Sequence, residues 1–214
     1  MAFGDGFGGE DQFFRHRRCA LSALLLACAA PAPVPQDRFY TLQAPPTPAA
    51  TAAPRALAAT LSVDGLAARA FLGGRQIVYR TAQEPLRVGR YPQLLWEVPP
   101  ARALAGQLAA ALRAAAPFEL VLGSQRHVRG DYVLSGELTR FEHLPTSAPP
   151  HVAAEFTLTL VRHADRRVLM NRRYHGREPT DAGTPAAMVS AFNRLAGRLT
   201  AEAAAEIGRL VPGP

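Results

Sequence analysis

The sequence predicts an α+β domain in which a mainly antiparallel sheet has two helices packed on one face. Several segments alternate apolar with polar residues, which is the period of a half-buried strand. Two alanine-rich segments instead repeat apolar residues at helical spacing, one from Pro99 to near Pro117 and one over residues 185–210. Because short loops join the strand segments and only two helices can connect them, an antiparallel sheet is favoured over a doubly wound one.

The first half of the domain carries three predicted strands and one helix. The strands are expected at residues 38–42, 57–64 and 76–80, the last after the turn at Gly73-Gly74. The Ala/Pro/Thr-rich stretch at 45–54 is expected to be a surface loop. Helix formation after Pro99 places three leucines on one face: Leu104, Leu108 and Leu112.

Three further strands and the second helix complete the domain, which spans residues 38–210. The strands are expected at 131–141, 152–161 and 167–175, each with one apolar face. On the third of them Val168, Met170 and Tyr174 are expected to face inward. The second helix, at 185–210, buries residues spaced by one turn: Met188, Phe192, Leu195 and Leu199.

The N-terminus predicts export and lipid anchoring. A basic group at 15–18 precedes an apolar stretch at 19–26, which is too short to span a bilayer, so residues 1–27 are expected to be a signal peptide. Leu25-Leu26-Ala27-Cys28 resembles the bacterial lipobox, which implies that Cys28 carries acyl chains such as palmitate. Residues 28–37 would then be a lipidated tether, whose Ala/Pro-rich part reaches at most roughly 25 Å. The alternative is that Cys28 is a lone buried cysteine.

The charge predicts an affinity for anionic partners. All 24 basic residues are arginines, and against 17 acidic residues they give a net charge of +7. The arginines are scattered, and no long basic run with interleaved aromatics indicates a nucleic-acid site. The densest groups are candidates for binding a partner protein: Arg166, Arg167, Arg172 and Arg173.

Known catalytic motifs do not occur in the sequence, so no enzyme activity, cofactor or metal is predicted. It has neither a Gly-x-Ser-x-Gly elbow nor a phosphate-binding glycine loop. Two groups of polar side chains are expected on wet strand faces, as solvated residues and not as metal ligands or paired carboxylates. They are the histidines His143, His151, His163 and His175, and the glutamates Glu137, Glu142 and Glu155.

A set of aromatic and proline residues, in a fixed order, resembles a known family. The residues are Phe39-Tyr40-x-Leu42, Ile77-Val78-Tyr79-Arg80, Tyr91, Trp96, Pro99-Pro100, Tyr132-x-Leu134 and Arg140-Phe141-Glu142, followed by the long C-terminal helix. Together they resemble the auxiliary lipoproteins of ABC-type transport systems, the PqiC-like family. We expect Tyr40, Tyr79, Tyr91, Trp96, Pro99 and Pro100 to be structural, with Trp96 a core aromatic.

The resemblance implies an accessory role in lipid transport between two membranes. The partners would be an MCE-domain protein with its ABC permease and ATPase, and the acylated chain would sit at the periplasmic face of the outer membrane. Ala29 follows Cys28 in place of the aspartate associated with inner-membrane retention. Oligomerisation of the chain stays open. The alternatives are an envelope-assembly lipoprotein, acting in peptidoglycan-synthase activation or lipopolysaccharide insertion, and a free-standing periplasmic enzyme.

Overall fold

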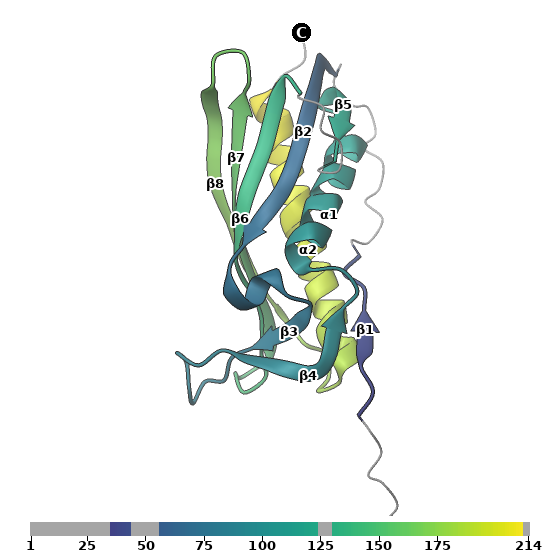
Figure 1. Cartoon of the computed structure of the whole chain (residues 1–214), viewed down its shortest axis with the longest axis vertical. Coiled ribbons are helices and arrows are strands. Elements are labelled where there is room, and N and C mark those ends of the chain that lie inside the picture. Colours follow the sequence, from purple (N-terminus) through teal and green to yellow (C-terminus); the bar gives the residue numbers. More distant parts are fainter. Residues whose placement is uncertain (1–34, 44–55, 124–129, 212–214) are drawn as a thin grey trace, which may run out of the picture. The chain divides into compact units, whose positions relative to one another are not determined.

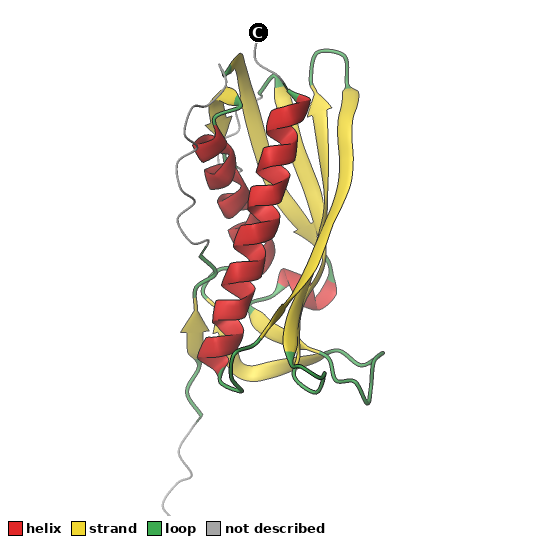
Figure 2. Cartoon of the chain, turned by 180° about the vertical axis from the view of Figure 1, so that it is seen from behind, coloured by secondary structure: helices red, strands yellow, loops and turns green. Residues whose placement is uncertain are grey.

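In the described part of the chain, eight strands form one mixed sheet, and two long helices cover one of its faces (Figures 1 and 2). The computed structural model describes residues 35–43, 56–123 and 130–211. The strands are β1 (Arg38–Tyr40), β2 (Leu57–Ala68), β3 (Gln76–Tyr79), β4 (Gly89–Trp96), β5 (Phe118–Leu122), β6 (Tyr132–Leu144), β7 (His151–Arg162) and β8 (Arg167–Pro179). The helices are α1 (Pro100–Ala115), α2 (Pro185–Leu210) and the short 3-10 helix η1 (Ala70–Gly73).

The strand order is β1-β4-β3-β6-β2-β5, with β7 paired to the other edge of β6 and β8 paired to β7. The two longest ladders, β6–β7 and β7–β8, are antiparallel, and so is β3–β4. Four shorter ladders are parallel: β1–β4, β2–β5, β2–β6 and β3–β6. The predicted α+β class is therefore confirmed, within a sheet that mixes both directions.

Both predicted helices are confirmed, and their ends follow from local residues. Pro100 occupies the first turn of α1, where a missing N–H costs nothing, and Ala116 ends the helix in a left-handed conformation. Thr184 caps α2, because its hydroxyl accepts a hydrogen bond of 3.2 Å from the Ala187 N–H. The leucines predicted to share a face of α1 are buried, as are the four residues predicted for α2.

The core lies between the two helices and the sheet face that they cover. Along β7 the even-numbered residues from Val152 to Leu160 are all buried, as their alternation predicts. At the end where α2 begins, aromatic rings fill the core. Phe192 of α2 stacks on Phe141 with ring centroids 4.5 Å apart, and its centroid lies 5.3 Å from that of Trp96.

Two bulges alter the predicted alternation. In β8 the register shifts so that Leu160 pairs with Met170 while Val161 pairs with Val168, which turns Val168 outward. Val168 is 56% exposed, so the prediction that it faces inward is wrong. In β6 a similar shift lies between Leu138 and Arg140. Strands β4 and β5 are additional to those predicted.

Candidate functional site

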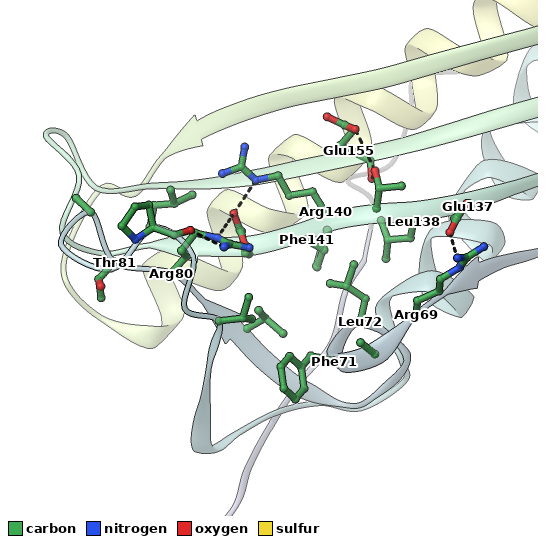
Figure 3. Close-up of a pocket in the computed structure, with 18 residues that line it drawn as sticks. Arg69, Phe71, Leu72, Arg80, Thr81, Glu137, Leu138, Arg140, Phe141 and Glu155 are labelled. Carbon is green, nitrogen blue, oxygen red and sulfur yellow. Dashed lines mark hydrogen bonds and ion pairs between the residues drawn. The ribbon is translucent and has the colours of Figure 1, made fainter.

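A pocket of about 720 Å³ lies on the part of the sheet that the helices leave uncovered. Its walls are β6, β7, η1 and the segment that follows β3 (Figure 3). On β7, Glu155 lines the pocket while its neighbour Phe156 is buried beside Tyr174 in the core, so the two residues lie on opposite faces. A volume of this size is typical of small-molecule sites.

The bulge in β6 places two consecutive polar residues at the pocket. Because Thr139 is the extra residue of the ladder, Arg140 pairs with Glu155. The Thr139 hydroxyl donates to the Glu155 carboxylate over 3.1 Å. The bulge also reverses the parity of the residues that follow, so Phe141 points into the core and Glu142 points towards the pocket.

Glu142 is the charged centre of the pocket. It is only 3% exposed, and both of its oxygens are paired with arginines. Nε of Arg140 donates to Oε1 over 2.6 Å, and Nε of Arg80 donates to Oε2 over 3.2 Å. The Arg80 Nη1 also donates to the Pro85 carbonyl over 2.6 Å. The expectation that Glu142 is an exposed glutamate is therefore wrong, because η1 and the segment after β3 cover this part of the strand.

This cluster of one buried carboxylate and two guanidinium groups carries one surplus positive charge. The side chains of Arg80 and Arg140 are 28% and 33% exposed, so water reaches both guanidinium groups. A second ion pair, Arg69 with Glu137 at 3.1 Å, lies at the opposite side of the pocket and is balanced in charge (Figure 3).

Apolar side chains line the space between these two charged groups. In Figure 3, Phe71 and Leu72 of η1 lie between the Arg80 side and the Arg69 side of the pocket. The guanidinium carbon of Arg90 lies 4.7 Å from the centroid of the Phe71 ring, close enough for a cation–π contact. Val78, Val88 and Leu144 also line the pocket.

Tyr79 and His143, the sequence neighbours of Arg80 and Glu142, form a cluster with Tyr91 on the other face of the sheet. The rings of Tyr79 and Tyr91 are 4.6 Å apart, and the Tyr91 hydroxyl hydrogen-bonds to Nδ1 of His143 over 2.9 Å. A side chain at Gly89 would clash with the Tyr79 ring, so glycine permits this close approach. Burial, and then Tyr79, raises the pKa of Tyr91 to about 12.

His143 is half-buried in this cluster, which contradicts the expectation of a solvated histidine. Burial, and then the nearby His151, lowers the pKa of His143 to about 4. The ring is therefore neutral at pH 7, and Nδ1 can accept from the Tyr91 hydroxyl. The β6 bulge explains the difference, because it pairs His143 with Val152 on the covered face. In the described residues no group of three or more His, Cys, Asp or Glu side chains could hold a metal ion.

The four arginines predicted to bind a partner do not form one patch. Arg166 lies in the β7–β8 turn with a left-handed φ of 56°, and Arg167 begins β8. Further along β8, Arg172 pairs with Glu206 of α2 at 3.2 Å, whereas Arg173 lies 4.0 Å from Glu155 at the pocket. These last two side chains therefore point to opposite faces of the sheet.

The family-motif residues gather around β1, β3, β4 and the start of α1. Trp96 is 1% exposed, and its backbone N–H donates to the Arg75 carbonyl over 2.6 Å. Tyr40 is half-buried in β1, and Pro99 and Pro100 begin α1. Cys28, the predicted signal peptide and most of the predicted tether lie outside the described residues. Sequence reasoning missed the pocket, because Arg69 and Phe71 belong to no motif that it used, and the motif that contains Arg80 does not indicate that this side chain meets Glu142.

Comparison with known proteins shows the family. Residues 40–204 match the family model of the ABC-type transport auxiliary lipoprotein component. None of the curated proteins matches the chain. Protein XCC0632 from Xanthomonas campestris has a similar solved structure, with a TM-score of 0.71 at 22% identity over 81% of this chain and 95% of that one. An uncharacterised protein has a TM-score of 0.60 at 18% identity over 82% of this chain and 98% of its own.

Proposed function

This chain belongs to the family of ABC-type transport auxiliary lipoprotein components. We propose that it is an accessory component of a lipid transport system that consists of an ABC permease, its ATPase and an MCE-domain protein. We place it at the periplasmic face of the outer membrane, held by acyl chains on Cys28, with a binding and not a catalytic role. The family match over residues 40–204 carries the proposal, because it covers nearly the whole described domain. None of the helices in the described ranges has the length and hydropathy that a membrane span requires.

The attachment of β1 supports an anchor at this end of the domain. β1 begins at residue 38, ten residues after Cys28, so the intervening chain can reach only about 35 Å if extended. β1 pairs with β4, and the Glu97 N–H donates to the Tyr40 carbonyl over 2.8 Å. A short tether joined to a fixed strand would keep the domain close to its membrane.

The β7–β8 turn supports a partner-binding role for the opposite end. In Figure 1 this turn and β1 lie at opposite ends of the described domain. Arg166 and Arg167 are exposed there. A domain anchored near β1 would therefore present these two charges away from its own membrane, where an MCE assembly would approach. Such a surface would steer association through its charge, and its binding would weaken with salt.

Anchoring and capture can be tested together in envelopes from cells that express the tagged chain. We expect the wild-type chain to fractionate with the outer membrane and to capture the MCE protein after detergent extraction. Cys28→Ser should release the chain from that fraction, or leave the leader uncleaved. Cys19→Ser, within the leader, is the matched control and should change neither result. An unmodified Cys28 in the mass spectrum of the wild-type N-terminus would contradict the anchor, and failure to capture any MCE protein would contradict the transport role.

A further inference from the structure

The pocket between η1 and β6 has a charge distribution that selects one class of ligand. Its charged centre, Glu142 with Arg80 and Arg140, has two positive charges for one negative charge. Its other ion pair, Arg69 with Glu137, is balanced. The remaining acidic lining residue, Glu155, lies 4.0 Å from Arg173 of β8, whose charge offsets it. The surplus positive charge thus lies at one side of the pocket, and an anionic group would bind at that side.

The guanidinium groups of this centre have N–H donors that make no hydrogen bond within the described residues. Arg140 uses only Nε within the described residues, and Arg80 uses Nε and Nη1, so Nη atoms of both remain available. Glu142 holds the two side chains side by side, which lowers the entropy cost of ordering them around a ligand. Charge-assisted hydrogen bonds from two arginines to one anion are among the stronger polar contacts in proteins.

The rest of the pocket is suited to a hydrocarbon chain. Beyond the charged centre the lining includes Phe71, Leu72 and Val88, and the pocket's volume of about 720 Å³ exceeds what a small anion would fill. Phe71 is 43% exposed, so a chain lying against it would remove apolar surface from water. In Figure 3, Phe71 and Leu72 lie between the Arg80 side and the Arg69 side of the pocket, where a chain that leads away from the charged centre would contact them.

We propose that this pocket binds an amphiphile with one anionic head, which Arg80 and Arg140 hold, and one acyl chain, which lies along Phe71, Leu72 and Val88. A carboxylate or a phosphate would satisfy the same donors, so the head group is defined by its negative charge. This inference goes beyond the transport role, because it concerns a ligand of the domain itself and depends only on the pocket.

The ligand series uses the mature chain, residues 28–214, with Cys28→Ser so that no detergent competes for the pocket. Decanoate, 1-decanol and inorganic phosphate are titrated by calorimetry. We expect decanoate to bind at one site per chain and decanol to bind at least about tenfold more weakly, because it lacks the charge. Phosphate should fail to displace decanoate at equal concentration. Absence of saturable decanoate binding, or equal binding of decanoate and decanol, would overturn the proposal. Displacement by equimolar phosphate would reduce the pocket to a site for free anions and would also overturn it.

Two pairs of variants locate the binding. Arg140→Gln removes the surplus charge and leaves Glu142 paired with Arg80, so decanoate affinity should fall by about tenfold while decanol affinity stays unchanged. Arg87→Gln, on the exposed segment nearby, removes the same charge and should leave both affinities within about twofold. Leu72→Trp fills the pocket and should abolish binding of both ligands. Leu86→Trp is its control, because Leu86 is 94% exposed and does not line the pocket.

Undiminished decanoate binding by Leu72→Trp would place the ligand elsewhere and overturn the proposal. If Arg140→Gln fails to fold, the ligand series and the Leu72 pair still decide the question. The test of the pocket and the test of the transport role can fail independently. A chain that binds decanoate but captures no MCE protein contradicts only the transport role, and the reverse result contradicts only the pocket.

Discussion

Trp96 shows how much one side chain of this domain contributes to stability. Its ring is buried against Phe141 and Phe192, with centroid distances of 5.7 and 5.3 Å. We expect Trp96→Ala to lower the free energy of unfolding by about 3 to 5 kcal/mol, because it removes a large buried ring and leaves a cavity. Denaturant titration measures the change, with Phe39→Ala, at an exposed ring, as the control. A folded Trp96→Ala chain of unchanged stability that loses only partner capture would indicate an interface.

The Glu142 cluster predicts an asymmetry between removing the acid and removing the bases. Glu142→Gln leaves two arginines that water already reaches, so we expect a loss of about 1 to 2 kcal/mol in the free energy of unfolding. Arg80→Gln with Arg140→Gln leaves a buried carboxylate without a cation, which should cost about 3 to 5 kcal/mol. Denaturant titration of both variants gives the comparison. Equal decreases in the free energy of unfolding would show that the Glu142 carboxylate becomes hydrated when its two arginine partners are removed.

His143 predicts a specific pH dependence of stability. Its pKa falls from 6.5 to about 4 on folding, so the unfolded chain takes up a proton first as the pH is lowered. The free energy of unfolding should therefore decrease between pH 6.5 and about 4, and this histidine's contribution should level off below pH 4. His143→Asn, which cannot titrate, should flatten that slope. His163→Asn, at an exposed position, should keep it, and equal slopes in all three chains would contradict the assignment.

At the scale of elements, regular periodicity could be predicted from the sequence and broken periodicity could not. The strands along β6, β7 and β8 and both helices were predictable, because their alternation or helical spacing is long. β4 was not, since Gly89 and Pro92 interrupt its pattern, and β5 has only five residues. The parallel ladders join strands that are connected by a crossover. The local sequence pattern of a strand does not encode which distant strand it pairs with.

The pocket depends on the same kind of missing information. The bulge at Thr139 shifts the parity of β6 by one residue, so His143 lies on the covered face of the sheet and not on the solvent-exposed face that simple alternation assigns to it. Arg69 and Arg80 reach Glu137 and Glu142 only after η1 and β3 fold against β6. Arg140-Phe141-Glu142 was visible in the sequence as a motif, but the arginine that completes its ion-pair cluster is some sixty residues earlier in the chain.

The short strand β1 depends on a contact with α2. The Asn193 side chain accepts from the Gln43 N–H over 3.0 Å and donates to the Thr41 carbonyl over 3.4 Å. We expect Asn193→Ala to increase hydrogen exchange at the amides of residues 39–43, because a strand of three residues has few other bonds. Asn171→Ala, which removes one exposed bond to Thr159 on the far strands, is the control. Unchanged exchange in the Asn193 variant would show that pairing with β4 alone holds β1.

At the scale of the whole molecule, the net charge of +7 and the position of individual arginines make separate predictions about partner capture. Arg166→Glu with Arg167→Glu lowers the net charge by four at the end of the domain opposite β1. Arg87→Glu with Arg102→Glu lowers it by the same amount outside the β7–β8 turn, in the segment before β4 and in the first turn of α1. Both pairs are exposed, so neither double variant should unfold the chain.

If the β7–β8 turn faces the MCE protein, reversal of Arg166 and Arg167 should weaken capture strongly at low salt. The effect should be smaller at high salt, because dissolved ions already screen much of the attraction between the two proteins. Reversal of Arg87 and Arg102 should have a small effect, since those charges lie outside the turn. Capture at a series of salt concentrations, with folding checked by circular dichroism, distinguishes the two. Equal weakening by both pairs would mean that the overall field steers association and the turn has no special role. Unchanged capture by the Arg166 and Arg167 variant at every salt concentration would contradict electrostatic recognition at this end of the domain.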